Sequence, residues 1–458
     1  MSDIVREELE KLGIYQLRIY ARQVGVKLAT TLKKADLIDS IMNVLNGNQE
    51  PYVKPTKKGR PAKEFIAQIG VQQSQGCSMS SPSDYGLNTL FNPDFAFDKM
   101  DRSKQFKTSG VLDVFANGSG VIVPRDGKRL YAFVGAKMIS EYKLKKGDLI
   151  EGNVCEINGE TILVLADIDK INGFNSLDTP ERLENFEKIS KSANLEFKGD
   201  SKLVKIFDLM DLKIKQGDKV LIASEDRKMV IVSIFNFIDI ISNVKDTKVV
   251  VLGVSITDDF VSMCNQYKNV KCIGAMLGDD VVTQLKMLDL GIQHVKNLVE
   301  YKDQNVLCVL LNVDNVIQMC DADLKEKWVT NLEKLFLMAG NTNAGSLTVA
   351  YGATINDNDK LYRDLELGVN VYLKACELVD SRRLLVKFNW LASYSNELIG
   401  YSVNSVDTYG YMLSMFLSSG KTATRQQQIE QWAIADLDKQ MIKSKIEEYI
   451  KNETNKGV

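Results

Sequence analysis

The sequence predicts a multidomain protein in which a small helical N-terminal module and a small β-barrel precede an α/β domain with a mostly parallel sheet. Its 458 residues allow about two to four domains, and 45% apolar with 26% charged side chains is ordinary for a folded chain. The spacing of apolar residues changes along the chain, from helical, to short alternating runs, to alternating strands and helices. All seven prolines lie at or before Pro180, so the chain is compositionally in two parts.

Residues 1–47 are expected to form the helical module. Their apolar residues recur at helical spacing in three runs, of which LKKADLIDSIMNVL is the last. Gly13, Gly25 and Gly47 stand where these helices would end. A segment this short buries too little surface to be a robust domain, so we expect an accessory module.

The composition of residues 48–107 predicts a flexible linker rich in Ser, Gly and Gln. Its first part, PYVKPTKKGRPAK, has five basic residues and no acidic one. A Gly-Arg-Pro core with flanking cations resembles an AT-hook, which lies in a narrow A·T minor groove. A solvated linker is the simpler alternative. The candidate DNA contacts are Lys57, Lys58, Arg60 and Lys63.

Residues 108–175 carry five short apolar runs separated by turn sequences such as NGSG, RDGK, KKGD and NGE. Five short strands in such a length are typical of a small Greek-key barrel of the oligonucleotide-binding (OB) type. The expected strands are VLDVFA, GVIVP, LYAFV, LIEGNVCEI and TILVLADI.

Residues 200–458 alternate apolar strands with helical segments, which indicates a mostly parallel sheet covered by helices. The segment 424–452 is expected to be helical. The expected strands are KVLIAS, KVVVLGV, KCIGAM, NVLCVLL, SLTVAYGA and RLLVKF.

Charge and rare residue types exclude several classes of function. Fifty-eight basic against 60 acidic side chains rule out a uniformly basic nucleic-acid coat, although not a local basic patch. With His294 as its single histidine, the chain has almost no imidazole side chains for a histidine-based metal site or for Ser-His-Asp catalysis, so we expect no metal site. Seven cysteines without a CxxC predict buried thiols in a reducing cytoplasm. No apolar run is long enough to span a membrane.

The order of these modules, and several stretches within them, resemble the bacterial transcription termination factor Rho. The resemblance implies an OB/cold-shock-like barrel followed by a RecA-like domain, in a ring-shaped hexamer that binds RNA and uses ATP with magnesium to move along it. The stretches are LGIYQLRIYARQVGVKL, SGVLDVFANGSGVIV, VGAKMISEYKLKKGDLIEGNV, IFDLMDLKIKQGDKVLIAS, HVKNLVEYKDQNVLCVLLNV and AGSLTVAYGATI.

The nucleotide-binding position departs from that family. A P-loop, G-x-x-x-x-G-K-[ST], needs glycines whose N–H groups close around phosphate. This chain has SEDRKMVIV there, and no glycine between Gly217 and Gly253. Asp226, Arg227 and Lys228 therefore mark a vestigial site, in which an acidic side chain would face the phosphates.

Three further parts of the motor are missing by the same comparison. Asn312 replaces the magnesium-binding aspartate after the strand VLCVLL, and Asp314 would be displaced by about 6–7 Å along a strand. The catalytic acidic pair aligns with Ser255 and Ile256, and the arginine finger falls near Cys376. The sequence therefore favours a RecA-like domain without cofactor and without ATP hydrolysis, although enzymatic activity stays open.

The barrel supplies the candidate RNA contacts. Rho-type barrels stack bases on aromatic residues, but this chain has Ser119 and Val121 at those positions of NGSGVIV. Other aromatic and basic residues lie close by in sequence, and core packing is an equal alternative for each aromatic ring. The candidates are Phe115, Arg125, Lys128, Arg129, Tyr131, Phe133 and Lys137.

These observations predict a Rho-like RNA-binding protein that acts in transcription termination or its regulation without ATP hydrolysis. One alternative is an active RNA-dependent ATPase or translocase, and another is a DNA-binding scaffold that uses the AT-hook-like linker. RNA or another single-stranded nucleic acid is the expected partner. Duplex DNA, a second copy of this chain and an authentic Rho ring stay open as further partners.

Overall fold

The chain divides by its internal contacts into two compact units, Met1–Gln73 and Ser74–Val458. The linker candidates Lys57, Lys58, Arg60 and Lys63, and the predicted strand RLLVKF, lie outside the described residues. The computed structural model describes residues 32–45, 100–125, 131–157, 162–183, 187–189, 214–242, 244–355, 360–375, 394–395, 422–435 and 437–456, with the single residues Ala21, Val26, Tyr85, Leu195 and Phe416.

The first unit contains the helix α3 (Lys34–Leu45), which confirms the last of the three helical runs. Its buried residues Leu37, Ile38, Ile41 and Met42 recur at the spacing of one helical face. That face gives the unit an apolar side.

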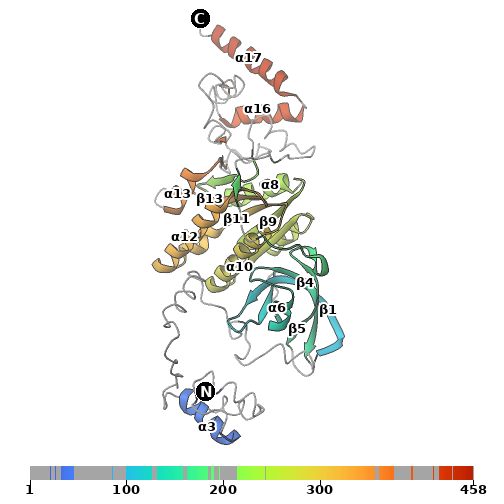
Figure 1. Ribbon diagram of the computed structural model, residues 1–458. Helices are drawn as coiled ribbons and strands as arrows, with labels where there is room; N and C mark the ends of the chain where they lie inside the picture. Colours follow the sequence, from blue (N-terminus) through green and yellow to red (C-terminus); the bar gives the residue numbers. More distant parts are fainter. Residues whose placement is uncertain are drawn as a thin grey trace. The chain divides into compact units, whose positions relative to one another are not determined.

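The second unit begins with a closed five-stranded sheet, as the sequence predicts (Figure 1). The sheet closes because β3 pairs with β2 on one side and, in parallel, with β5 on the other. A sixth strand of two residues pairs antiparallel with the end of β5. The elements are β1 (Met100–Val114), β2 (Gly120–Pro124), β3 (Ala132–Val134), α6 (Ala136–Glu141), β4 (Leu149–Ile157), β5 (Leu163–Ile171) and β6 (Phe174–Asn175).

Two features of this barrel correct the expectation from sequence. Strand β1 begins at Met100, inside the predicted linker, because its polar first half pairs with β4 although it lacks apolar alternation. Phe106, for example, pairs with Val154. The short helix α6 between β3 and β4 was also missed, since six residues are too few for a helical period to be read.

The α/β part is built on a sheet with the order β10-β9-β11-β13-β8-β14-β15. The pairs along this path are parallel up to β14, whereas β15 and the short β12 and β7 add antiparallel pairs. The carboxyl ends of the parallel strands therefore meet at one edge. The strands are β7 (Lys188–Ile189), β8 (Lys219–Ser224), β9 (Thr247–Ile256), β10 (Val270–Met276), β11 (Gln304–Leu311), β12 (Gly340–Thr342), β13 (Gly345–Thr354), β14 (Val371–Lys374) and β15 (Tyr394–Ser395).

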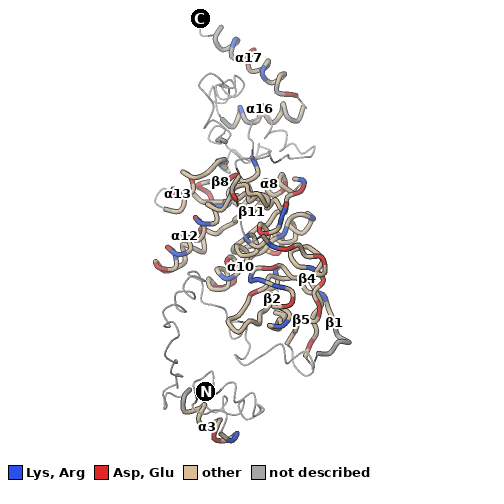
Figure 2. The backbone as a smooth tube through the Cα atoms, in the orientation of Figure 1, with Lys and Arg blue, Asp and Glu red and all other residues tan. Residues whose placement is uncertain are grey.

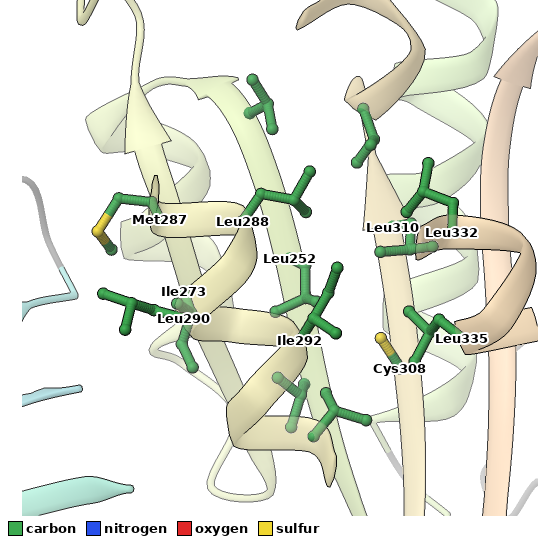
Figure 3. Packing of buried hydrophobic residues seen from close by; sticks show 14 of the residues in the cluster. Leu252, Ile273, Met287, Leu288, Leu290, Ile292, Cys308, Leu310, Leu332 and Leu335 are labelled. Atoms are coloured by element: carbon green, nitrogen blue, oxygen red, sulfur yellow. The ribbon is translucent and has the colours of Figure 1, made fainter. Parts of the chain in front are cut away.

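Helices cover both faces of this sheet. Alternate residues of β8 show the division, because Val220 and Ile222 join one core cluster while Leu221 and Ala223 join the other. The first cluster includes residues of α8 (Arg227–Ile241), α9 (Asp258–Cys264), α16 (Thr422–Ile434) and α17 (Lys439–Lys456). The second includes residues of α10 (Val281–Val299), α11 (Val313–Gln318), α12 (Ala322–Met338) and α13 (Lys360–Gly368), and Figure 3 shows α10 and α12 packed against β9, β10 and β11.

A buried polar network joins the barrel to α10. Asp148, which is fully buried, accepts hydrogen bonds from Asn172 Nδ2 at 2.9 Å, Asn297 Nδ2 at 2.7 Å and Arg182 Nη2 at 2.5 Å. Asn172 Nδ2 also donates to the Tyr301 hydroxyl at 3.2 Å. Because buried polar groups are costly unless paired, these bonds fix how the barrel seats on the helix.

The single histidine belongs to the same contact region. His294 is buried, and its Nδ1 donates to the Gly147 carbonyl oxygen at 3.0 Å. Burial lowers the pKa of His294 to about 4, so the ring is neutral. This position gives His294 a packing role and no catalytic one.

Acidification is expected to weaken the fold through His294. The unfolded ring takes a proton near its usual pKa of about 6.5, while the folded ring does so only near 4. The stability that it contributes is therefore fully present above about pH 6.5, and about 3 kcal/mol of it is lost as the pH falls to 4. Comparison of unfolding free energies of the wild type and His294→Asn across this range measures the effect. An imidazole NMR signal that titrates at the usual pKa would contradict it.

Candidate functional site

The predicted aromatic RNA contacts lie on one face of the β1–β2–β3 sheet. Val121 pairs with Phe133 across the strands and with Asp113, which places these residues on the same face as Phe115, two positions further along. Phe115 and Phe133 are each only 3% exposed, whereas Tyr131 is half-buried. Two of the three rings therefore pack into the protein, and Tyr131 is the ring that reaches the surface.

Tyr85, which sequence reasoning missed, covers this face. Its ring meets Tyr131 edge-on with 4.9 Å between centroids, and it lies tilted on Phe115 at 5.9 Å. Its hydroxyl donates to Asp113 Oδ2 at 2.6 Å. A lone tyrosine in a Ser/Gly-rich segment gives no periodic signal, so only its aromatic character within a polar stretch could have drawn attention to it.

Two lysines complete the surroundings of Tyr85. Lys286 of α10 places its Nζ 3.8 Å from the centre of the Tyr85 ring and 3.9 Å from Asp113 Oδ2. Lys146 Nζ lies 3.7 Å from Asp113 Oδ1 and 2.7 Å from Asp289. The buried carboxylate of Asp113 is thus balanced by cations on both sides. We call Tyr85, Phe115, Tyr131, Asp113 and Lys286 the tyrosine cage.

Two of the four predicted basic contacts of the barrel lie among the described residues. Arg125 follows β2 and is half-buried, and its Nη1 has no hydrogen-bond partner among the described residues. Lys137 is exposed on α6. Lys128 and Arg129 lie outside the described residues, so their position relative to the aromatic face is not described.

The residues predicted to mark a vestigial nucleotide site lie at the carboxyl edge of the parallel sheet, where ligands bind in α/β proteins. Asp226 follows β8 and caps α8, and its Oδ1 accepts from the Lys228 backbone N–H at 2.8 Å. Its own N–H donates to Ser224 Oγ at 3.2 Å. The N–H group that a phosphate would use at such a helix start is thus bound to a carboxylate of the chain itself. An Asp just before an apolar helical run is an N-cap signal that could have predicted this bond.

The residues that follow β11, which is separated from β8 by β13, also form contacts within the fold. Asn312 has left-handed backbone angles before α11, and its Nδ2 donates to the Val254 carbonyl oxygen at 3.2 Å. Asp314 lies in the first turn of α11 and accepts from the Thr354 backbone N–H at 3.2 Å. The strand ends before Asp314, so the expected displacement along a strand is wrong, because the chain has already turned into a helix. Burial raises the pKa of Asp314, which disfavours the charge that a magnesium ligand needs.

Two cavities lie away from these residues. One of about 730 Å³ is at the opposite, amino edge of the sheet, between Thr247, Lys248 and Lys268. The other, of about 540 Å³, crosses β1, β4 and β5 of the barrel and is lined by both basic and acidic residues. Figure 2 shows that both kinds of residue occur along the barrel strands. The lysines of this second cavity pair with acids, as Lys107 does with Asp169. Neither cavity includes a residue that the sequence singled out.

The described residues form neither a candidate metal-ion cluster nor a candidate membrane span. No group of three or more His, Cys, Asp or Glu side chains that could hold a metal ion is found there. No helix in that part of the chain is both long and apolar enough to cross a membrane. The described cysteines are free thiols, buried at Cys155, Cys264, Cys272 and Cys308 and half-buried at Cys320.

Comparison with known proteins gives distant structural similarity alone. No family model matches the sequence, and no curated protein matches it. Among solved structures, a prototypical ATPase from the type III secretion system of pathogenic bacteria is similar with a TM-score of 0.38 and 11% identity, over 50% of this chain and 74% of that one. The ATP synthase subunit NeqB from Nanoarcheaum equitans is similar with a TM-score of 0.38 and 13% identity, over 54% and 78%. At TM-scores this low, neither similarity assigns the chain an activity.

Proposed function

We propose that this chain is a Rho-like protein that binds single-stranded nucleic acid, RNA foremost, through its barrel and acts in transcription termination or its regulation without hydrolysing ATP. The observation that carries this proposal is the connection of the barrel strands. They close in the order β1-β2-β3-β5-β4, with α6 between β3 and β4, which is the connectivity of oligonucleotide-binding barrels. The helix-covered parallel sheet follows it in the chain, as the resemblance to Rho implies.

The contacts of Asp226 and Asn312, at the carboxyl edge of the parallel sheet, support the loss of motor chemistry. Phosphoryl transfer depends on positioning and charge neutralisation by a glycine-rich cradle and a magnesium ligand. Here the Asp226 carboxylate accepts from the Lys228 N–H at the start of α8, and Asn312 stands where the resemblance places the magnesium ligand. An acidic cap repels the phosphates that such a cradle attracts.

Binding of a fluorescein-labelled pyrimidine RNA strand to the full chain, followed by fluorescence anisotropy, tests the proposal. We expect saturable binding that weakens with salt, with unlabelled RNA competing better than an A·T duplex of equal length. Absence of binding at low salt would contradict the proposal. Stronger competition by the duplex would favour a DNA-binding scaffold instead.

A further inference from the structure

We propose that Tyr85 acts as an internal competitor of nucleic acid, occupying the aromatic face of the barrel until a single strand displaces it. This inference rests on the proposed function and adds a regulation of the same site. In this arrangement the closed state has Tyr85 in the tyrosine cage, and the open state has a nucleobase on Tyr131.

The ring contacts of Tyr85 are of the kind that a base would make. Bases bind single-strand-binding barrels by stacking on aromatic rings, and any planar ring can take that place. The Tyr85 ring contacts both Tyr131 and Phe115, at centroid distances of 4.9 and 5.9 Å. Tyr85 is itself only 9% exposed, so its ring fills the space beside Tyr131 and Phe115 that a base would take.

Polar and charged contacts hold the tyrosine in position. Its hydroxyl donates to the buried carboxylate of Asp113 at 2.6 Å, which is a hydrogen bond to a charged acceptor. Lys286 Nζ lies over the Tyr85 ring, 3.8 Å from its centre. Lys286 belongs to α10, so the α/β part contributes to the closed state.

Tyr85 belongs to no strand of the barrel. It precedes β1, which begins at Met100, and makes no strand pair. Its release breaks the ring contacts of the tyrosine cage and the hydrogen bond to Asp113, but no strand pairing. Lys286 then lies beside the vacated aromatic face, as cations do in single-strand grooves, where they attract the phosphate backbone.

The test compares RNA affinities of the full-length wild type and three variants by anisotropy with a labelled pyrimidine strand. Tyr85→Ala is expected to bind about tenfold more tightly, because the competitor is gone. Tyr85→Phe keeps the ring but loses the bond to Asp113, and is expected to bind about threefold more tightly. Tyr142→Ala is the matched control, because Tyr142 ends α6 and packs against a separate core of the barrel that includes Leu112 and Ile150. Its affinity is expected to be unchanged.

The outcomes separate this inference from the proposed function. If the wild type binds RNA and Tyr85→Ala binds it equally or more weakly, the competitor role of Tyr85 is wrong, while the proposed nucleic-acid binding stands. No RNA binding by any variant overturns the proposed function and the competitor with it. Thermal unfolding checks that each variant is folded, and if Tyr85→Ala is not, an unchanged affinity of Tyr85→Phe overturns the competitor.

Discussion

Replacing Asp148 by alanine is expected to lower the free energy of unfolding by about 3–5 kcal/mol, as found when one partner of a buried ion pair is removed. Asp148 is fully buried and accepts from Arg182, Asn172 and Asn297. Its removal leaves a largely buried guanidinium without its closest counter-ion, and the amide groups of Asn172 and Asn297 each lose one of their two acceptors. Chemical denaturation of the full chain, monitored by circular dichroism, measures the loss.

An exposed ion pair on the same barrel is the control for Asp148. Lys107 and Asp169 lie 2.5 Å apart, but their side chains are 73% and 41% exposed. Lys107→Ala is therefore expected to cost less than about 1 kcal/mol. If Asp148→Ala costs no more than Lys107→Ala, the polar network does not hold the barrel on α10.

Gly147→Ala is expected to cost about 3 kcal/mol or more, for two separate reasons. Gly147 has a φ of +91°, a conformation that is strained for alanine. An added Cβ would also lie 2.5 Å from Gln293 Cβ and 2.7 Å from the His294 backbone nitrogen, so α10 would have to move. The same denaturation experiment measures the change, and His294 NMR shifts report whether the helix has moved.

Gly173→Ala separates the two causes. Gly173 has a φ of +86°, close to that of Gly147, but nothing lies within 4 Å of its added Cβ. Its substitution is expected to cost about 1–2 kcal/mol, the conformational part alone. Equal costs at Gly147 and Gly173 would show that close packing of the barrel loop on α10 contributes nothing.

The strands were predictable because their signals are local. GVIVP and KVLIAS coincide with β2 and β8, since a short apolar run between turn residues suffices to mark a buried strand. The pairing of β3 with β5, which closes the barrel, was predicted only through the class of fold. The polar start of β1 was missed because its stability comes from its partner β4 and not from its own apolar pattern.

The site was less predictable because its contacts join distant residues. Phe115 and Phe133 were chosen for their chemistry, yet burial decides what an aromatic ring can do, and burial follows from packing. Tyr85 and Asp113 are 28 positions apart, and no spacing rule connects them. At the carboxyl edge of the parallel sheet, the sequence already showed the missing glycines and the acidic Asp226. The hydrogen bond from the Lys228 N–H to Asp226 could be seen only in the structure.

The most direct test of the proposal that this chain is a Rho-like protein without motor chemistry is the rate of ATP hydrolysis by the full chain, measured with magnesium and saturating pyrimidine RNA. We expect RNA to be bound without RNA-stimulated turnover, because Asp226 caps the start of α8 and Asn312 stands where the proposed resemblance to Rho places the magnesium ligand. RNA-stimulated turnover of about 1 s⁻¹ or faster, within the ordinary range of enzymes, would contradict this.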